Sequence, residues 1–273
     1  MKKLLVFAGV LALSVSPVFG QTTLSADGRT DTYTLIDNVF STPGGSIAYE
    51  VPDCSHPAFG PHITQSFNST INQYVFNFYI HVTPDNDRCI NFDRQRNEVK
   101  TWLDSLVAFQ GDTLEQRWKF QLPSGFQPSP DFTHIHQVKP IDGNADLPII
   151  TLTPRYGTPN MLQLGHYDDG EVYTTLAQTP LAPFLGTWVE ADEVAFYDFS
   201  GSYSITIRRV SDGVVLFSYS SNNIEMWRSD TTRVRGKWGI YRSLLSSSYL
   251  RDEDVLYRGI CVAKAPATCP SIQ

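Results

Sequence analysis

Short strand-like segments separated by turn residues follow one another through most of this chain, and they constrain its fold more than any other feature. Residues 74–82 (YVFNFYIHV) are aromatic and β-branched, and they end at a turn sequence, residues 84–87 (PDND). Residues 116–122 alternate, so a strand there places Trp118, Phe120 and Leu122 on one face and Arg117, Lys119 and Gln121 on the other. Helical periodicity is scarce, and the segments predict an all-β chain.

The same patterns predict strands at residues 92–100, 132–139, 147–154, 161–164, 187–199, 202–210, 214–220 and 235–243. Residues 179–185 have room for only a short helical turn because they contain Pro180 and Pro183. Many short strands with frequent turn residues indicate two sheets closed over an apolar core, as in a concanavalin-like sandwich or β-jelly roll. One curved sheet of such a fold often forms an open groove, which suits a long polymer.

The first twenty residues resemble a secretory signal peptide. Lys2 and Lys3 precede the apolar run 4–15, and small residues up to Gly20 suggest cleavage before Gln21. No later apolar run is long enough to cross a bilayer. We therefore expect a secreted, extracellular protein whose residues 21–273 form a single domain and which is a monomer.

The charge of the chain limits its partners. Its 21 basic and 28 acidic residues become 19 and 28 without Lys2 and Lys3, a net charge of −9. An acidic protein does not attract nucleic acid or an anionic membrane, so neither is expected as a partner. An anionic ligand is still possible if the basic residues gather in one place.

All four cysteines follow the expected cleavage site, and in an exported chain they predict two disulfides. Pairing by proximity gives Cys54–Cys89 and Cys261–Cys269. Without paired CxxC sequences, a structural zinc site built on cysteine is not expected. Asn68 begins an N-x-S/T sequence and is a candidate glycosylation site in a eukaryotic host.

Two histidines lie on the predicted strand 132–139. Strict alternation places His134, His136 and Val138 on one face and Ile135, Gln137 and Lys139 on the other. Two imidazoles side by side on a sheet suggest catalysis or metal binding more than packing.

Two further strands point polar groups to one side. Alternation gives residues 92–100 a face made of Arg94, Arg96, Glu98 and Lys100. For an isolated strand, a solvated edge with mutual ion pairs explains such a face as well as a binding site does. Residues 235–243 direct Trp238 and Ile240 to one side and, to the other, Lys237, Gly239, Tyr241 and Ser243. The bare backbone at Gly239 would let a ligand lie close.

Together these strands resemble jelly-roll alginate lyases. Residues 96–100 (RNEVK) are similar to the R-T-E-L-R strand of that group. Residues 134–136 (HIH) are similar to its Q-I-H, with His134 in place of Gln, and residues 237–241 (KWGIY) to its K-A-G-V-Y.

A closer resemblance is to the glucuronan lyases, polysaccharide lyase family 20. It covers roughly residues 45–262 and rests on an ordered set of stretches, residues 51–57, 59–65, 93–98, 125–130, 134–137 and 237–243. Each motif alone is weak, and the ordered set is fairly specific.

This resemblance implies a lyase that cleaves polyuronates by β-elimination, with an anionic polysaccharide as partner. The carboxylate beside C5 must be neutralised, and Arg96 is the candidate by motif, with His134 beside it. Tyr241 is then the candidate base and acid of a syn elimination, and His136 a helper or an alternative base. Substrate binding is expected from basic and polar residues of these strands, namely Arg94, Glu98, Lys100, Arg117, Lys119 and Lys237. Protonation of His134 would favour activity at mildly acidic pH.

The residues also allow different functions. The histidine pair with a third ligand from His62, His81 or Glu98 would make a catalytic transition-metal site. Residues 190–193 (EADE) suggest a glycoside hydrolase, although alternation separates Glu193 from Glu190. A non-catalytic carbohydrate-binding module would have the same fold, and a lyase with these motifs would also suit alginate in place of glucuronan. No cofactor is expected for catalysis. The resemblance also allows a structural Ca²⁺, for which an acidic turn such as residues 85–87 is a candidate, with a plain solvated turn as the alternative.

Overall fold

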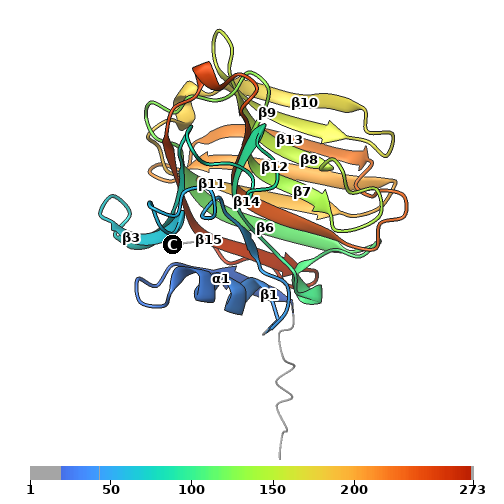
Figure 1. Cartoon of the computed structure of the whole chain (residues 1–273). Helices are drawn as coiled ribbons and strands as arrows, with labels where there is room; N and C mark the ends of the chain where they lie inside the picture. Colours follow the sequence, from blue (N-terminus) through green and yellow to red (C-terminus); the bar gives the residue numbers. More distant parts are fainter. Residues whose placement is uncertain (1–19, 43, 272–273) are drawn as a thin grey trace, which may run out of the picture.

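The computed structural model describes residues 20–42 and 44–271, and the predicted signal peptide lies outside them except for Gly20. Two antiparallel sheets make up most of this part of the chain (Figure 1). The first sheet has eight strands: β1 (Gln21–Leu24), β3 (Ile63–Asn68), β4 (Gln73–Ile80), β6 (Thr113–Gln121), β11 (Val189–Phe196), β12 (Gly201–Arg209), β13 (Val215–Ile224) and β15 (Glu253–Lys264).

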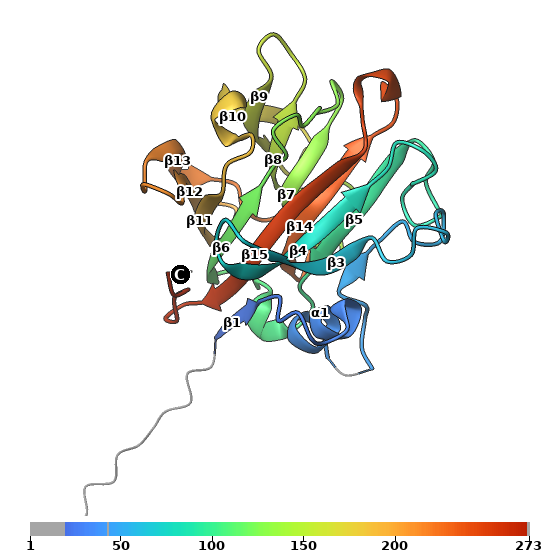
Figure 2. The same ribbon diagram turned by 90° about the vertical axis from the view of Figure 1, so that its left-hand side faces the viewer.

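The second sheet has seven strands: β2 (Tyr49–Glu50), β5 (Arg94–Lys100), β7 (Thr133–Pro140), β8 (Ile150–Arg155), β9 (Met161–Tyr167), β10 (Tyr173–Pro180) and β14 (Val234–Ser243). Its order is β10-β9-β8-β7-β14-β5-β2, so β14 lies between β7 and β5, as Figure 2 shows. The predicted all-β jelly roll is confirmed. The expected strands are present with shifted ends; residues 187–199, for example, contain the shorter β11.

The core lies between the two sheets. Trp118 of β6 meets Trp238 of β14 across it, with ring centroids 6.1 Å apart, and both rings are fully buried. Since neighbouring residues of a strand alternate, the residues beside these tryptophans point away from the core, on opposite outer faces of the sandwich. The two outer faces therefore present different side chains to solvent.

Helix α1 (Thr32–Phe40) was not predicted. The carboxylate of Asp31 caps it by accepting a hydrogen bond from the Thr34 backbone at 2.9 Å, and Ile36 and Phe40, one turn apart, are buried. Three 3₁₀ turns complete the elements: η1 (Asp104–Leu106), η2 (Ala182–Phe184) and η3 (Ser247–Tyr249). The expectation of one short turn within residues 179–185 corresponds to η2.

Both predicted disulfides, Cys54–Cys89 and Cys261–Cys269, are present. Asn68 ends β3, and its side-chain oxygen accepts a hydrogen bond from the Thr70 backbone at 3.1 Å; glycosylation there stays a prediction. Among the described helices, none has the length and apolar character needed to cross a membrane.

Candidate active site

Tyr241 is at the centre of the second sheet. Antiparallel pairing on its two sides places it opposite Arg96 of β5 and opposite His134 of β7. Because Ile240 points into the core, the tyrosine side chain points to the outer face. The three strands singled out from the sequence are therefore adjacent, and one residue from each meets at this point.

Two guanidinium groups surround the Tyr241 ring. Arg94 donates a hydrogen bond from Nη1 to the phenol oxygen at 3.1 Å, and the Cζ atom of Arg96 lies 3.6 Å from the ring centroid. Phe132 packs against the same ring at 5.0 Å between centroids. Any negative charge on the phenol oxygen is thus stabilised by adjacent cations.

Arg96 is held by carboxylates. Its Nε donates to Asp87 at 3.0 Å and its Nη1 to Glu98 at 2.7 Å, and only 8% of the residue is exposed. These bonds fix the plane of the guanidinium and leave Nη2 as its remaining donor group. A planar donor fixed in this way suits a ligand carboxylate.

Glu98 and Lys237 form an ion pair beneath the groove surface. The Lys237 ammonium lies 2.7 Å from Glu98 and 2.5 Å from Glu50, and both Glu98 and Lys237 are about 1% exposed. Burial alone would raise the pKa of Glu98, but the adjacent Lys237 and Arg96 lower it. The prediction that Glu98 and Lys237 bind substrate directly is wrong, because their charged atoms are buried and already paired with each other. They hold Arg96 in place instead.

Lys100 is farther along β5. Its ammonium pairs with Glu50 at 3.0 Å and lies 5.3 Å from the ring centroid of Trp102. It lines a separate hollow rather than the cavity at Tyr241. Direct contact of Lys100 with a ligand stays a prediction.

His134 faces the groove beside Tyr241. Its Nδ1 lies 2.7 Å from the Thr153 hydroxyl, and its ring stacks on Phe132 with centroids 5.0 Å apart. Burial lowers the pKa of His134 to about 3, and the cations Arg155 and Arg96 act in the same direction. This favours a neutral His134 at mildly acidic pH, and an effect of its protonation on activity stays a prediction.

His136 lies in the core, not in the groove. It is fully buried, its Nδ1 lies 2.9 Å from the Lys237 carbonyl oxygen, its Nε2 lies 3.1 Å from Glu193, and its ring packs on Trp118 at 4.4 Å. The pairing of β7 with β14 shifts register between Trp238 and Tyr241, so His134 and His136 point to opposite sides of the sheet. The prediction of His136 as base or helper is wrong for this reason.

Gly239 sits at this register shift. Its φ is +144°, and a Cβ there would lie 2.1 Å from the Asn97 carbonyl oxygen. Glycine is required here by the neighbouring strand rather than by an approaching ligand.

Several groove residues were missed, among them Gln137, Lys139, Arg155, Asp131, Asp146 and Tyr167. They line, together with Arg94, Arg96, His134 and Tyr241, a cavity of ≈ 260 Å³. Burial lowers the pKa of Lys139 to about 7, and the positive charges of Lys237 and Arg96 contribute. Strict alternation had placed Gln137 and Lys139 opposite His134, and only the irregular pairing brings them to the same face.

Arg117 and Lys119 belong to the other sheet. Arg117 pairs with Asp192 at 2.8 Å and Lys119 with Glu190 at 3.8 Å, on the outer face of β6 and β11. The prediction that they bind substrate together with the Tyr241 cluster is wrong, because the core separates the two faces.

The histidine pair and the acids of β11 do not form the sites that the sequence allowed for them. His134 and His136 cannot share an ion because they point to opposite sides of the sheet. Glu193 is buried and hydrogen-bonded by Tyr203 at 2.7 Å, whereas Glu190 faces outward, so the acids of β11 do not converge on a ligand.

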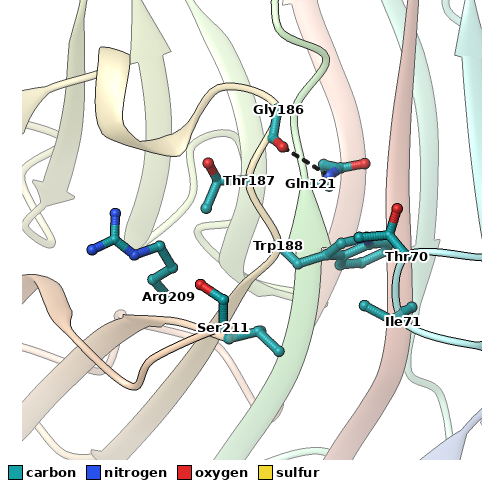
Figure 3. Close-up of a pocket in the computed structure, with 9 residues that line it drawn as sticks. Thr70, Ile71, Gln121, Gly186, Thr187, Trp188, Arg209 and Ser211 are labelled. Carbon is teal, nitrogen blue, oxygen red and sulfur yellow. Dashed lines mark hydrogen bonds between the residues drawn. The ribbon is translucent and has the colours of Figure 1, made fainter.

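A second cavity, of ≈ 280 Å³, lies at the end of the first sheet (Figure 3). It is lined by Trp188, Gln121 and the hairpin residues Thr70 and Ile71. Among the described residues that line this cavity, Arg209 is the one titratable side chain, and it is hydrogen-bonded to Asp212. The lining therefore lacks an acid–base group suited to catalysis.

No protein-family model matches the chain, and no curated protein matches it by sequence. Solved structures match by fold. An endo-β-1,4-glucuronan lyase from the fungus Trichoderma reesei has a TM-score of 0.53 at 14% identity, over 75% of this chain and 88% of that one. Family 7 alginate lyase A1-II′, in complex with substrate, has a TM-score of 0.54 at 12% identity, over 93% and 96%.

A third structure, alginate lyase Aly36B in complex with an alginate trisaccharide, has a TM-score of 0.55 at 9% identity, over 90% of this chain and 99% of that one. At these identities the likeness is one of fold. The chain has the two-sheet jelly-roll fold that these polysaccharide lyases share.

Proposed function

We propose that this protein is a secreted polysaccharide lyase that cleaves a β-1,4-linked polyuronate by syn β-elimination. The observation that carries the proposal is the phenol of Tyr241 in a cavity on the outer sheet face, with Arg94 bonded to its oxygen and Arg96 against its ring. The jelly-roll fold that the chain shares with glucuronan and alginate lyases supports it.

The uronate carboxylate is neutralised first. The proton on C5 is weakly acidic while the adjacent carboxylate carries a full charge, so donors must be fixed where negative charge develops. Arg96 supplies Nη2, and Lys139 and Gln137 line the same cavity. The buried ion pair of Glu98 and Lys237 keeps Arg96 in position without reacting itself.

Tyr241 then moves the proton. In its phenolate form it takes the proton from C5, the C5–H electron pair forms the C4=C5 double bond, and the bond from C4 to the glycosidic oxygen breaks. The same phenol returns the proton to the departing O4, because in a syn elimination both positions lie on one side of the sugar ring. Arg94 and Arg96 stabilise the phenolate. Neutral His134 lies beside Tyr241, with ring centroids 5.9 Å apart, and orients the tyrosine ring.

Glucuronan is the proposed substrate. It is supported by the ordered resemblance of residues 45–262 to glucuronan lyases and by the fold shared with the fungal enzyme. Polymannuronate is the alternative, since glucuronate and mannuronate differ at C2, away from the elimination.

The test is incubation with polyglucuronate, polymannuronate and polyguluronate blocks of alginate, and pectate, monitored by the ultraviolet absorbance of the unsaturated ends. The proposal predicts rising absorbance with polyglucuronate and shorter products on size separation. Absorbance that rises with polymannuronate alone would move the assignment to alginate. Binding to these polymers without any rise would identify a carbohydrate-binding module and overturn the proposal.

A further inference from the structure

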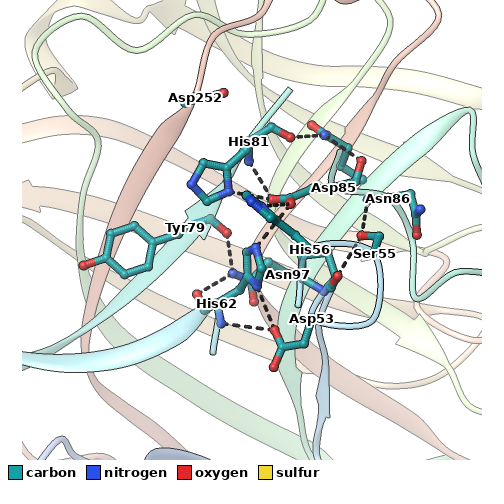
Figure 4. A network of polar contacts seen from close by, with 12 residues as sticks. Asp53, Ser55, His56, His62, Tyr79, His81, Asp85, Asn86, Asn97 and Asp252 are labelled. Atoms are coloured by element: carbon teal, nitrogen blue, oxygen red, sulfur yellow. Dashed lines mark hydrogen bonds and ion pairs between the residues drawn. The ribbon is translucent and has the colours of Figure 1, made fainter. Parts of the chain in front are cut away.

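Three histidines and an aspartate converge behind the groove, at His56, His62, His81 and Asp85 (Figure 4). One ligand atom from each lies within 4.8 Å of all the others. The β2–β3 connection carries His56 and His62, and the β4–β5 connection carries His81 and Asp85. The Cys54–Cys89 disulfide joins the same two connections.

The spacing is close to that of a tetrahedral metal site. Asp85 Oδ1 lies 3.0 Å from Nδ1 of His56 and 3.2 Å from Nε2 of His62, and its Oδ2 lies 3.0 Å from Nδ1 of His81. Zinc–ligand bonds of about 2.0–2.1 Å place tetrahedral ligand atoms about 3.3 Å apart. The four ligand atoms lie within 4.8 Å of one another, so the wider pairs must move closer together to bind one ion.

His62 has a carboxylate at both ring nitrogens. Its Nδ1 lies 2.8 Å from Asp53 and its Nε2 lies 3.2 Å from Asp85. A protonated ring would donate to both carboxylates, whereas a ring bound to a metal ion keeps one N–H and donates to only one of the two. The Asp53 contact is the one that orients a metal-binding histidine, with Nδ1–H donated to a carboxylate and Nε2 directed at the ion. Asp53 is itself fixed by the Tyr33 hydroxyl at 2.7 Å.

The surroundings suit a closed site. Asp85 is 2% exposed and His62 is fully buried, and the ring of Phe59 packs on His62 and His81 at 4.8 and 4.3 Å between centroids. Three imidazole nitrogens with one carboxylate oxygen are a donor set for Zn²⁺ rather than for Ca²⁺, which takes six to eight oxygens. The other carboxylate of the acidic turn, Asp87, is bound to Arg88 and Arg96.

The cluster is connected to the groove through β5. Gln95 donates to the backbone oxygens of His81 and Asp85, and Asn97 donates to that of His62 at 2.8 Å. These two residues flank Arg96, which is itself bonded to Asp87 two residues beyond Asp85. The cluster therefore fixes the segment that orients Arg96.

We propose that His56, His62, His81 and Asp85 form a structural zinc site that holds the β2–β3 and β4–β5 connections together and thereby orients Arg96. All four positions of a tetrahedral ion are filled by protein, so the site is structural and takes no part in the elimination. The zinc site does not depend on the proposed lyase activity.

Metal content of the disulfide-intact, full-length secreted protein tests it. Protein made in zinc-supplemented medium is expected to retain one Zn²⁺ per chain after gel filtration, measured by plasma mass spectrometry. Removal by a chelator should lower Tm, and Zn²⁺ alone, but not Ca²⁺, should restore it. Co²⁺ in its place should give the visible absorption bands of a tetrahedral ion.

Variants separate a metal site from a hydrogen-bonded cluster. We expect His56→Gln, whose side chain is partly exposed, to weaken Zn²⁺ binding more than ~100-fold, and Asp53→Asn to weaken it about 10–100-fold. His166→Gln on β9, bonded to the Glu225 carbonyl oxygen, is the control and should bind normally. Wild-type protein that binds no Zn²⁺ in titration and keeps its Tm with chelator would overturn the proposal, because the histidines would then serve only as hydrogen-bond partners of Asp85.

Discussion

At the scale of single residues, substitution of Tyr241 is expected to have the most direct effect on activity. Tyr241→Phe removes the oxygen that carries the proton and keeps the ring that packs on Arg96 and Phe132. We expect kcat on the cleaved polymer to fall by about 10²–10⁴-fold with Tm nearly unchanged. Tyr219→Phe on β13, in the other sheet, is the matched control and should retain full activity. Near-normal turnover of a folded Tyr241→Phe protein would exclude the assignment.

The pKa of Lys139 predicts how the activity depends on pH. Because burial lowers its pKa to about 7, its ammonium is present below that pH and is lost as the pH rises above it. A lost cation weakens binding of the uronate carboxylate, so kcat/KM should fall about tenfold between about pH 6 and about pH 8. Lys139→Arg, which stays charged throughout, should remove this fall. A profile that is the same in the variant would show that another group titrates.

At the scale of elements, the pairing of β7 with β14 decides which side chains reach the groove. Gly239→Ala adds a Cβ at φ +144° that collides with the Asn97 backbone. We expect about 3 kcal/mol or more of lost stability in denaturant unfolding. Gly213→Ala, at φ +72° with open space around it, is the control and should cost about 1–2 kcal/mol. Equal losses at both positions would show that backbone conformation alone is responsible.

The same irregularity limits what the sequence can predict. Alternation places Tyr241, Arg94 and Arg96 correctly because β14 and β5 pair in regular register, and no residue is skipped between them. It fails at His136 and Lys139, since a register shift is set by contacts with a neighbouring strand and leaves no period in the sequence of its own strand. Helix α1 was missed because nine residues contain too few turns to show a helical period.

The histidine and aspartate cluster was missed for a related reason. His56 and His81 are 25 positions apart in the sequence, and they meet only because the two connections are folded against each other beside β5. The disulfide pairing of Cys54 with Cys89 was correctly predicted by proximity, and it already implied that these connections meet. The disulfide does not indicate, however, that the imidazoles of the two connections converge, and the structure was needed to show this.

At the scale of the whole molecule, the two sheets divide the basic residues between two outer faces. The cavity at Tyr241 collects Arg94, Arg96, Lys139 and Arg155 on one face of a chain whose net charge is −7. Arg117 and Lys119, on the other face, are each paired with an acidic residue of β11. The cavity at Tyr241 therefore offers four cations to a polyuronate, beside the two acids Asp131 and Asp146 of the same lining.

Neutralising a cation on each face tests this division. Arg155→Gln removes a charge that lines the cavity. A hydrogen bond from that charge to the uronate carboxylate of the polymer would be worth about 1.5–3 kcal/mol, so we expect KM to rise about tenfold or more while kcat changes little. Arg117→Gln and Lys119→Gln should leave KM unchanged, because both side chains belong to the first sheet, across the core from the cavity at Tyr241. Initial rates on the cleaved polymer give KM, and thermal unfolding gives stability. A rise in KM for Lys119→Gln without a rise for Arg155→Gln would place the polymer on the first sheet instead, because the core separates the two outer faces.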